Sequence, residues 1–169
     1  MIYWLLHGFV GAILLRAGMG KLLHVRDFYW QVRSAAFFPR RLEPLVAFAI
    51  PALEVVAGCG VLAGAPAGWW PDALAFLLLA SFAGYALWIA VTGRTIRCFC
   101  FGRDDGDIGW ATVARNLTLV CSLAASVVCP PPELGLLPVT LSVTDGLTAS
   151  LIFIAVFQLY SIRREFEKA

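Results

Sequence analysis

The chain has 169 residues, of which 60% are hydrophobic and 14% are charged. Soluble domains carry about 45–50% apolar and about 25% charged residues, so this chain lacks the polar side chains that cover a soluble sphere. The formal net charge of +2 is too small to indicate nucleic-acid binding. We therefore predict an integral membrane protein that is surrounded by lipid and has no nucleic-acid partner.

Five apolar runs divide the chain, over about residues 2–20, 44–64, 72–92, 110–129 and 145–162. A helix rises about 1.5 Å per residue, so some 20 residues cross a hydrocarbon core about 30 Å thick. The first run has no basic segment before it and no small-residue cleavage pattern after it, which favours a retained helix over a signal peptide. The sequence predicts an all-α fold: a single membrane domain over residues 1–169, built as a bundle of about five transmembrane helices.

Lysine and arginine are concentrated in alternate connectors. Residues 21–43 carry five, residues 93–109 carry three and the tail 163–169 carries three, whereas residues 65–71 and 130–144 carry none. Basic residues mark the cytoplasmic side of a membrane. We therefore predict an inner-membrane protein with its amino terminus outside and its carboxyl terminus in the cytoplasm. The first connector is also rich in aromatic residues, which is typical of a helix lying in the headgroup layer.

Ionisable residues inside the predicted spans are costly and mark either function or a specific pairing. Glu54 lies about ten residues into the second span, roughly 15 Å deep by helical rise. Arg16 and Lys21 stand near the end of the first span, where long side chains are expected to reach the headgroups. Arg115 stands one to two turns into the fourth span. Glu54 is too deep and too short to reach water, so we hypothesise a pair between Glu54 and Arg115. A lone His7 in the first span is expected to be hydrogen-bonded structure rather than a ligand.

Cys98 and Cys100 stand together in the third connector and leave three interpretations open. They are a redox pair, two inert cysteines, or part of a metal site. Neighbouring arginines favour the thiolate, and a ring closed between positions i and i+2 is strained and easily reduced. A structural zinc site needs four ligands, of which His24 would be a third, and no fourth is evident. The remaining cysteines lie in or beside apolar spans, where cysteine often behaves as a small hydrophobe.

Four sequence elements then appear in a characteristic order. They are Ala17-Gly18-Met19-Gly20-Lys21-Leu22, Pro51-Ala52-Leu53-Glu54, Cys98-Phe99-Cys100-Phe101-Gly102, and Ile108-Gly109-Trp110 followed by Val113-Ala114-Arg115-Asn116-Leu117. Together, over roughly residues 10–128, the chain resembles the methylamine-utilisation MauE family of DoxX-like small membrane proteins. Members of that family usually read Cys-Gly-Cys-Phe-Gly, and Phe99 stands here in place of the middle glycine. The predicted helix at about 145–162 is an addition to the family-like region.

The resemblance implies a multi-pass inner-membrane protein that helps to mature a disulfide-rich periplasmic enzyme, alongside a membrane-tethered thioredoxin-like partner. It implies Cys98 and Cys100 as the redox pair, with Lys21, Glu54 and Arg115 in supporting roles. No cofactor is evident, and a quinone is a partner that the sequence leaves open. The alternative is a non-enzymatic membrane subunit or assembly factor whose cysteines are structural and whose polar groups hold helices together.

The predicted side of the membrane conflicts with a periplasmic role for the thiols, because the basic residues place Cys98 and Cys100 in the cytoplasm. Two arrangements would resolve the conflict. Further thiols, Cys59 and Cys129, would carry electrons across the membrane, or the loop would be re-entrant, which is tolerated where protein buries the backbone.

Overall fold

The computed structural model describes residues 2–64, 69–98, 107–128 and 144–156. These residues form helices α1 (Ile2–Leu23), α2 (Val25–Ala35), α3 (Glu43–Ala63), α4 (Trp70–Thr92) and α5 (Trp110–Val128). A further helical segment covers Thr144–Val156. The predicted all-α fold class is confirmed. Helices α1, α3 and α4 are long and apolar enough to cross a membrane, whereas spanning by α5 and by the last segment stays a prediction.

The helices begin and end where the local chemistry of the chain requires it. Proline occupies the first turn of both α3 and α4, where its missing N–H removes no helical hydrogen bond. Gly64 follows α3 and Gly93 follows α4, with φ of 67° and 66°. Glycine adopts such positive φ values without a steric penalty, so it ends a helix readily. These signals fix the bounds of the second and third predicted spans to within a few residues.

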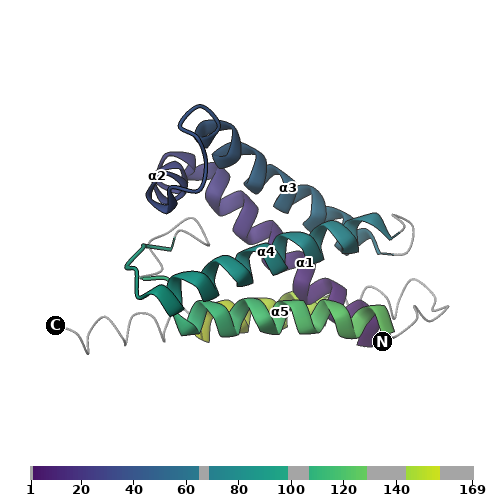
Figure 1. The fold of residues 1–169 in the computed structure, drawn as a ribbon. Coiled ribbons are helices and arrows are strands. Elements are labelled where there is room, and N and C mark those ends of the chain that lie inside the picture. The colour runs from purple at the N-terminus through teal and green to yellow at the C-terminus, as the bar shows by residue number, and fades with distance from the viewer. Residues whose placement is uncertain (1, 65–68, 99–106, 129–143, 157–169) are drawn as a thin grey trace.

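The helices form two antiparallel pairs, α1 with α3 and α4 with α5 (Figure 1). Helix α2 lies at the end of the molecule where α1 finishes and α3 starts. The carboxyl end of α4 and the amino end of α5 are at this same end. The two basic connectors of residues 21–43 and 93–109 therefore leave the bundle on one side, as their charge predicts. We call this the α2 end.

Glycines bring α1 and α3 into close contact. A Cβ atom at Gly18 would lie 2.8 Å from the Pro51 carbonyl oxygen, and one at Gly58 would lie 2.9 Å from the Leu15 amide nitrogen. Small residues at such positions let membrane helices approach along their backbones. This approach sets the register of the two helices and brings Lys21 of α1 within reach of Glu54 of α3.

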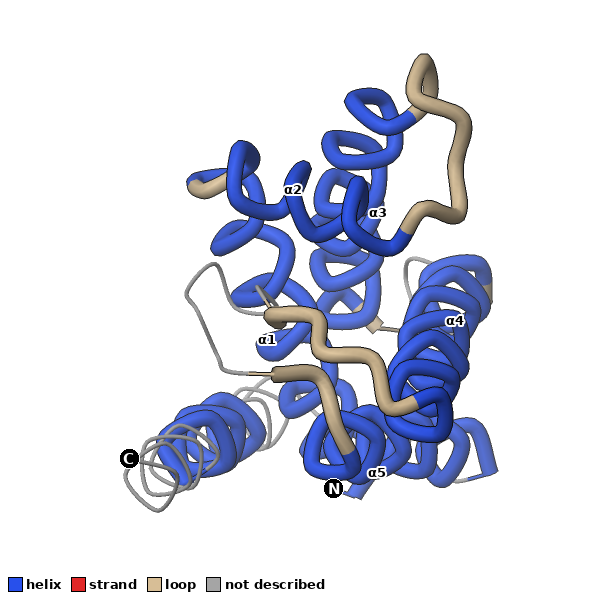
Figure 2. Tube along the Cα trace, turned by 60° about the vertical axis from the view of Figure 1, so that its left-hand side comes forward, coloured by secondary structure: helices blue, strands red, loops and turns tan. Residues whose placement is uncertain are grey.

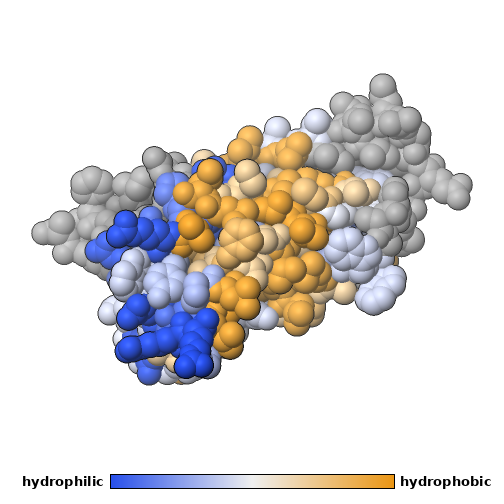
Figure 3. Space-filling view, turned by 90° about the horizontal axis from the view of Figure 1, so that it is seen from above, coloured by the Kyte–Doolittle hydropathy of each residue, from blue (hydrophilic) through white to orange (hydrophobic). Residues whose placement is uncertain are grey.

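The outer surface carries a broad apolar band, with hydrophilic side chains gathered at the α2 end (Figure 3). Leu45, Phe48 and Val56 of α3 are all exposed on this surface. Trp69 and Trp70 are exposed at the start of α4, and Trp110 is exposed at the start of α5. Exposed tryptophans at helix ends are typical of the two membrane–water interfaces. The surface thus has the pattern expected of a protein embedded in lipid.

Candidate functional site

A buried ion pair joins α1 to α3. Lys21 Nζ lies 2.5 Å from Glu54 Oε1, and the two side chains are 3% and 2% exposed. The expectation that Lys21 reaches the headgroups is therefore wrong: the short helix–helix distance directs its ammonium inward to the carboxylate. Arg16, five residues earlier on α1, is exposed, and its expected position among the headgroups stays a prediction.

Four helices supply the surroundings of the Lys21 ammonium. Its Nζ atom lies 4.3 Å from the centroid of the Phe82 ring on α4 and 5.3 Å from that of the Phe28 ring on α2. A desolvated cation over an aromatic face gains electrostatic attraction from the ring quadrupole. The ion pair is thus enclosed by the α1–α3 contact on one side and by two aromatic rings on the other.

Arg115 of α5 adds a second positive charge to this region. It is 5% exposed, and its charge attracts the Glu54 carboxylate. We hypothesised a direct pair of Glu54 with Arg115. In the structure the direct partner of Glu54 is Lys21, and Arg115 acts as a further positive charge. The second carboxylate oxygen, Glu54 Oε2, is buried and accepts no hydrogen bond from the described residues. A buried carboxylate oxygen that accepts no hydrogen bond is an atom that can take up a proton.

Cys98 is disulfide-bonded and only 1% exposed. Its side chain is part of an apolar cluster with Ala86, Ile89, Ile96, Ile108 and Val113. Among the described residues, Cys59 and Cys121 are free and exposed. Cys100 lies outside the described residues, so its pairing with Cys98 stays a prediction, and the same holds for a role of Cys129.

Backbone pairing closes the base of the cysteine loop. Arg97 and Asp107 form an antiparallel bridge, and the Ile108 amide donates to the Ile96 carbonyl across 2.8 Å. The two connecting segments run side by side from α4 and into α5 (Figure 2). Ile96 and Ile108, which flank the bridge, both point into the Cys98 cluster. The loop is therefore tied to the bundle at its base.

One face of α4 connects the ion pair to the cysteine. Phe82 contacts Lys21, while Ala86 and Ile89, one and two turns later, belong to the Cys98 cluster. Helix α5 makes the same connection, since Val113 is in that cluster and Arg115 acts on Glu54. Helices α4 and α5 therefore link the group of Lys21, Glu54 and Arg115 to the separate apolar cluster that contains Cys98.

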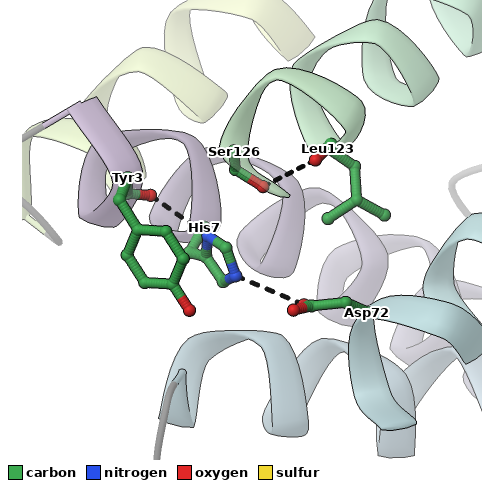
Figure 4. Close-up of polar contacts among 5 residues, drawn as sticks. All are labelled: Tyr3, His7, Asp72, Leu123 and Ser126. Carbon is green, nitrogen blue, oxygen red and sulfur yellow. Dashed lines mark hydrogen bonds and ion pairs between the residues drawn. The ribbon is translucent and has the colours of Figure 1, made fainter. Parts of the chain in front are cut away.

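A second polar cluster lies near the starts of α1 and α4, toward the opposite end of the bundle (Figure 1). Figure 4 shows its contacts. His7 Nε2 of α1 lies 3.2 Å from Asp72 Oδ1 of α4, and His7 is 1% exposed. The other ring nitrogen lies 3.1 Å from the Tyr3 carbonyl oxygen, and the Tyr3 ring stacks on the imidazole at 3.9 Å. The expectation that His7 is hydrogen-bonded structure is confirmed. Sequence reasoning missed Asp72, whose signal is a lone carboxylate in the first turn of an apolar helix.

The fold and these contacts define a polytopic helical membrane protein with a buried ion pair and a disulfide-bonded cysteine at one end. Residues 1–129 match the family model described as methylamine utilisation protein MauE. The methylamine utilization protein MauE of Paracoccus denitrificans is 31% identical over 162 residues, which cover 95% of this chain and 84% of the relative. The chain belongs to the MauE family, as its motifs indicated. The family match ends before the Thr144–Val156 helix, and no solved structure matches the chain significantly.

Proposed function

We propose that this protein transfers electrons between thiols and disulfides during the maturation of an extracytoplasmic protein, with Cys98 and Cys100 as the exchanging pair. By its relationship to the Paracoccus protein, it would serve methylamine utilisation. The observation that carries the proposal is the disulfide-bonded Cys98 in a loop tied to the end of a membrane bundle. A thioredoxin-like protein anchored in the membrane is the proposed exchange partner, and a periplasmic protein is the proposed client.

The burial of Cys98 decides which sulfur of the disulfide an incoming thiolate would attack. An incoming thiolate attacks the partner sulfur of the disulfide, and the Cys98 sulfur leaves as a thiolate. The neighbouring Arg97 and Arg94 favour that thiolate electrostatically. A second thiol of the partner would then attack the mixed disulfide, which releases the partner in its oxidised, disulfide form and leaves Cys98 and its bonding partner as two thiols.

Lys21, Glu54 and Arg115 support this chemistry in the proposal. Lys21 and Arg115 are cations beside the Glu54 carboxylate, and in the proposal their positive charges favour a thiolate on the same side of the bundle. Oxidation of two thiols releases two protons, and Glu54 Oε2 is a buried acceptor on the same side of the bundle. Glu54 would therefore take up a proton as the thiols are oxidised.

An inner-membrane location with the amino terminus outside completes the proposal. It is supported by the grouping at the α2 end of the two basic connectors, one of which contains Cys98. In this proposal the cysteine loop is on the cytoplasmic side. Electrons would then pass between a periplasmic client and the Cys98 pair through the membrane-tethered partner or through further thiols of this chain.

A second candidate is an assembly factor whose disulfide is structural. It is favoured by the position of Cys98, which is enclosed by aliphatic side chains in the manner of a core residue. In this case the bond would hold the loop against α4 and α5 and would not cycle.

Differential alkylation separates the two candidates. The protein is blocked with one maleimide, reduced with thiols of graded potential, labelled with a second maleimide and weighed by mass spectrometry. We expect the Cys98 bond to open at the potential of a thioredoxin-like protein, and the Cys98→Ser/Cys100→Ser variant to lose client maturation. The Cys59→Ser/Cys121→Ser variant, which lacks the two free exposed thiols, is the matched control. A bond that resists every reductant short of denaturation, with full maturation by the double variant, would establish the structural role instead.

A further inference from the structure

A partly open cavity of about 750 Å³ lies between α2, α3 and α4. Small-molecule sites usually measure about 300–1,000 Å³, so this volume is sufficient for a ligand ring with an attached chain. Its walls are unusually rich in aromatic side chains. Six rings line it, namely Phe28, Phe37, Phe38, Phe82, Tyr85 and Trp88.

The aromatic wall is shared with the functional site. The Lys21 ammonium lies over the rings of Phe28 and Phe82 and makes a cation–π contact with each. Tyr85 and Trp88 pack against the apolar cluster that contains Cys98. The Arg94 guanidinium lies 4.6 Å from the Trp88 ring centroid. Two side chains that line the cavity therefore also pack against the cluster that contains Cys98.

One polar group in the wall selects between possible occupants. The Tyr85 hydroxyl is buried and makes no hydrogen bond with the described residues. A buried hydroxyl without a partner is costly, so a ligand that supplies an acceptor at this point gains affinity. An acyl chain supplies no acceptor and gains nothing from flat rings, whereas a ring that carries carbonyl oxygens satisfies both features.

We propose that this cavity binds the head group of an isoprenoid quinone, which accepts the electrons of the Cys98 pair. This inference rests on the proposed thiol–disulfide function. The ring would stack among the aromatic side chains, one carbonyl oxygen would accept a hydrogen bond from Tyr85, and the isoprenoid tail would leave through the open side into lipid.

The reaction balances without a further reactant. Two S–H bonds break, one S–S bond forms, and two electrons and two protons are released. The quinone takes up both electrons and both protons, so that its two carbonyl groups become the two hydroxyl groups of a quinol. Both quinone and quinol are lipid-soluble, so both can exchange with the bilayer.

Binding is tested by titrating decylubiquinone into the full-length protein in phosphatidylcholine nanodiscs while tryptophan fluorescence is followed. We expect saturable quenching that is lost in Trp88→Phe. A Cβ atom at Gly84 meets nothing within 4 Å, and Gly84 lines the cavity. Gly84→Phe should therefore fill the cavity without a clash and raise Kd at least tenfold. Leu87→Phe, on the exposed outer side of α4, is the matched control and should change Kd less than twofold. Tyr85→Phe should raise Kd about fivefold, the effect of one lost hydrogen bond.

Further measurements in the same binding assay distinguish a quinone from lipid chains as the occupant of the cavity. Decylbenzene, which has the tail and a ring but no carbonyl, should not displace the quinone at equal concentration. Equal displacement, or quenching that Gly84→Phe and Leu87→Phe reduce alike, would mean that the cavity holds lipid chains and would overturn the inference. The Cys98→Ser/Cys100→Ser variant should bind with unchanged Kd. Thiols that exchange in the alkylation assay while decylubiquinone fails to bind would overturn the quinone and leave the proposed function intact. Binding by a protein whose thiols never exchange would overturn the function and, with it, the role of the quinone as acceptor.

Discussion

Replacing Glu54 by leucine should destabilise the bundle strongly, because it leaves the Lys21 ammonium buried and without its counter-ion. Lys21 is 3% exposed and cannot regain water without separating α1 from α3. Removing one partner of a buried pair typically costs about 3–5 kcal/mol. At about 1.4 kcal/mol per tenfold change, this loss lowers the folding equilibrium constant by a factor of roughly 150 to 4,000.

The assay is reversible unfolding of the purified protein in mixed detergent and SDS micelles, followed by tryptophan fluorescence. Arg16→Met is the matched control, since it removes an exposed charge from the same helix and should cost less than about 0.5 kcal/mol. The Lys21→Met/Glu54→Leu variant removes both charges and should recover most of the lost stability, because well-packed apolar residues often replace a buried ion pair at no cost. A Glu54→Leu variant as stable as Arg16→Met, or a double variant whose loss equals the sum of the two single losses, would refute the reasoning.

Three other perturbations have defined outcomes. Gly18→Leu should lower the free energy of unfolding by at least about 2 kcal/mol, because its side chain would meet the backbone of α3. Gly84→Leu, at a position where a Cβ atom meets nothing within 4 Å, is its control in the same unfolding assay. Equal losses in the two variants would contradict the close approach of α1 and α3. Asp72→Asn should lower the free energy of unfolding by about 1–3 kcal/mol, because it weakens the contact with His7. The same substitution should lower it by less in a His7→Phe background, and additive losses would exclude a direct interaction. A membrane-impermeant maleimide applied to reduced intact cells should leave Cys98 unlabelled, and labelling from outside would reverse the proposed orientation.

Composition and periodicity were sufficient to predict the helices, but the partners of the buried charges depend on registers between helices. The depth of Glu54 follows from its position in an apolar run. Its direct partner does not, because Lys21 and Arg115 are both long enough and both near the same end. The close α1–α3 approach at Gly18 and Gly58 decides the matter by bringing Lys21 to the carboxylate. A single sequence shows both glycines but does not show that they face each other.

The cysteine site was only partly predictable for a similar reason. The spacing of Cys98 and Cys100 left redox, inert and metal roles open, since all three need the same residue types. The disulfide bond of Cys98 and its enclosure by Ile89 and Val113 appear only when α4 and α5 pack together. The aromatic cavity was equally out of reach, because its rings come from α2, α4 and the segment after α2, each of which looks like an ordinary interfacial or lipid-facing stretch.

The ion pair itself is an argument for function. A buried pair pays a large desolvation penalty, so stability alone does not account for the presence of Lys21 and Glu54 inside the bundle. The same double variant that tests their stability therefore also tests their role. If Lys21→Met/Glu54→Leu folds as well as the unmodified protein and keeps its Cys98 disulfide, but exchanges thiols at least tenfold more slowly, then the pair acts on the chemistry through charge or proton transfer. If it folds and exchanges at the normal rate, the pair serves only to fix how α1 and α3 meet, and the supporting role proposed for Lys21 and Glu54 is excluded.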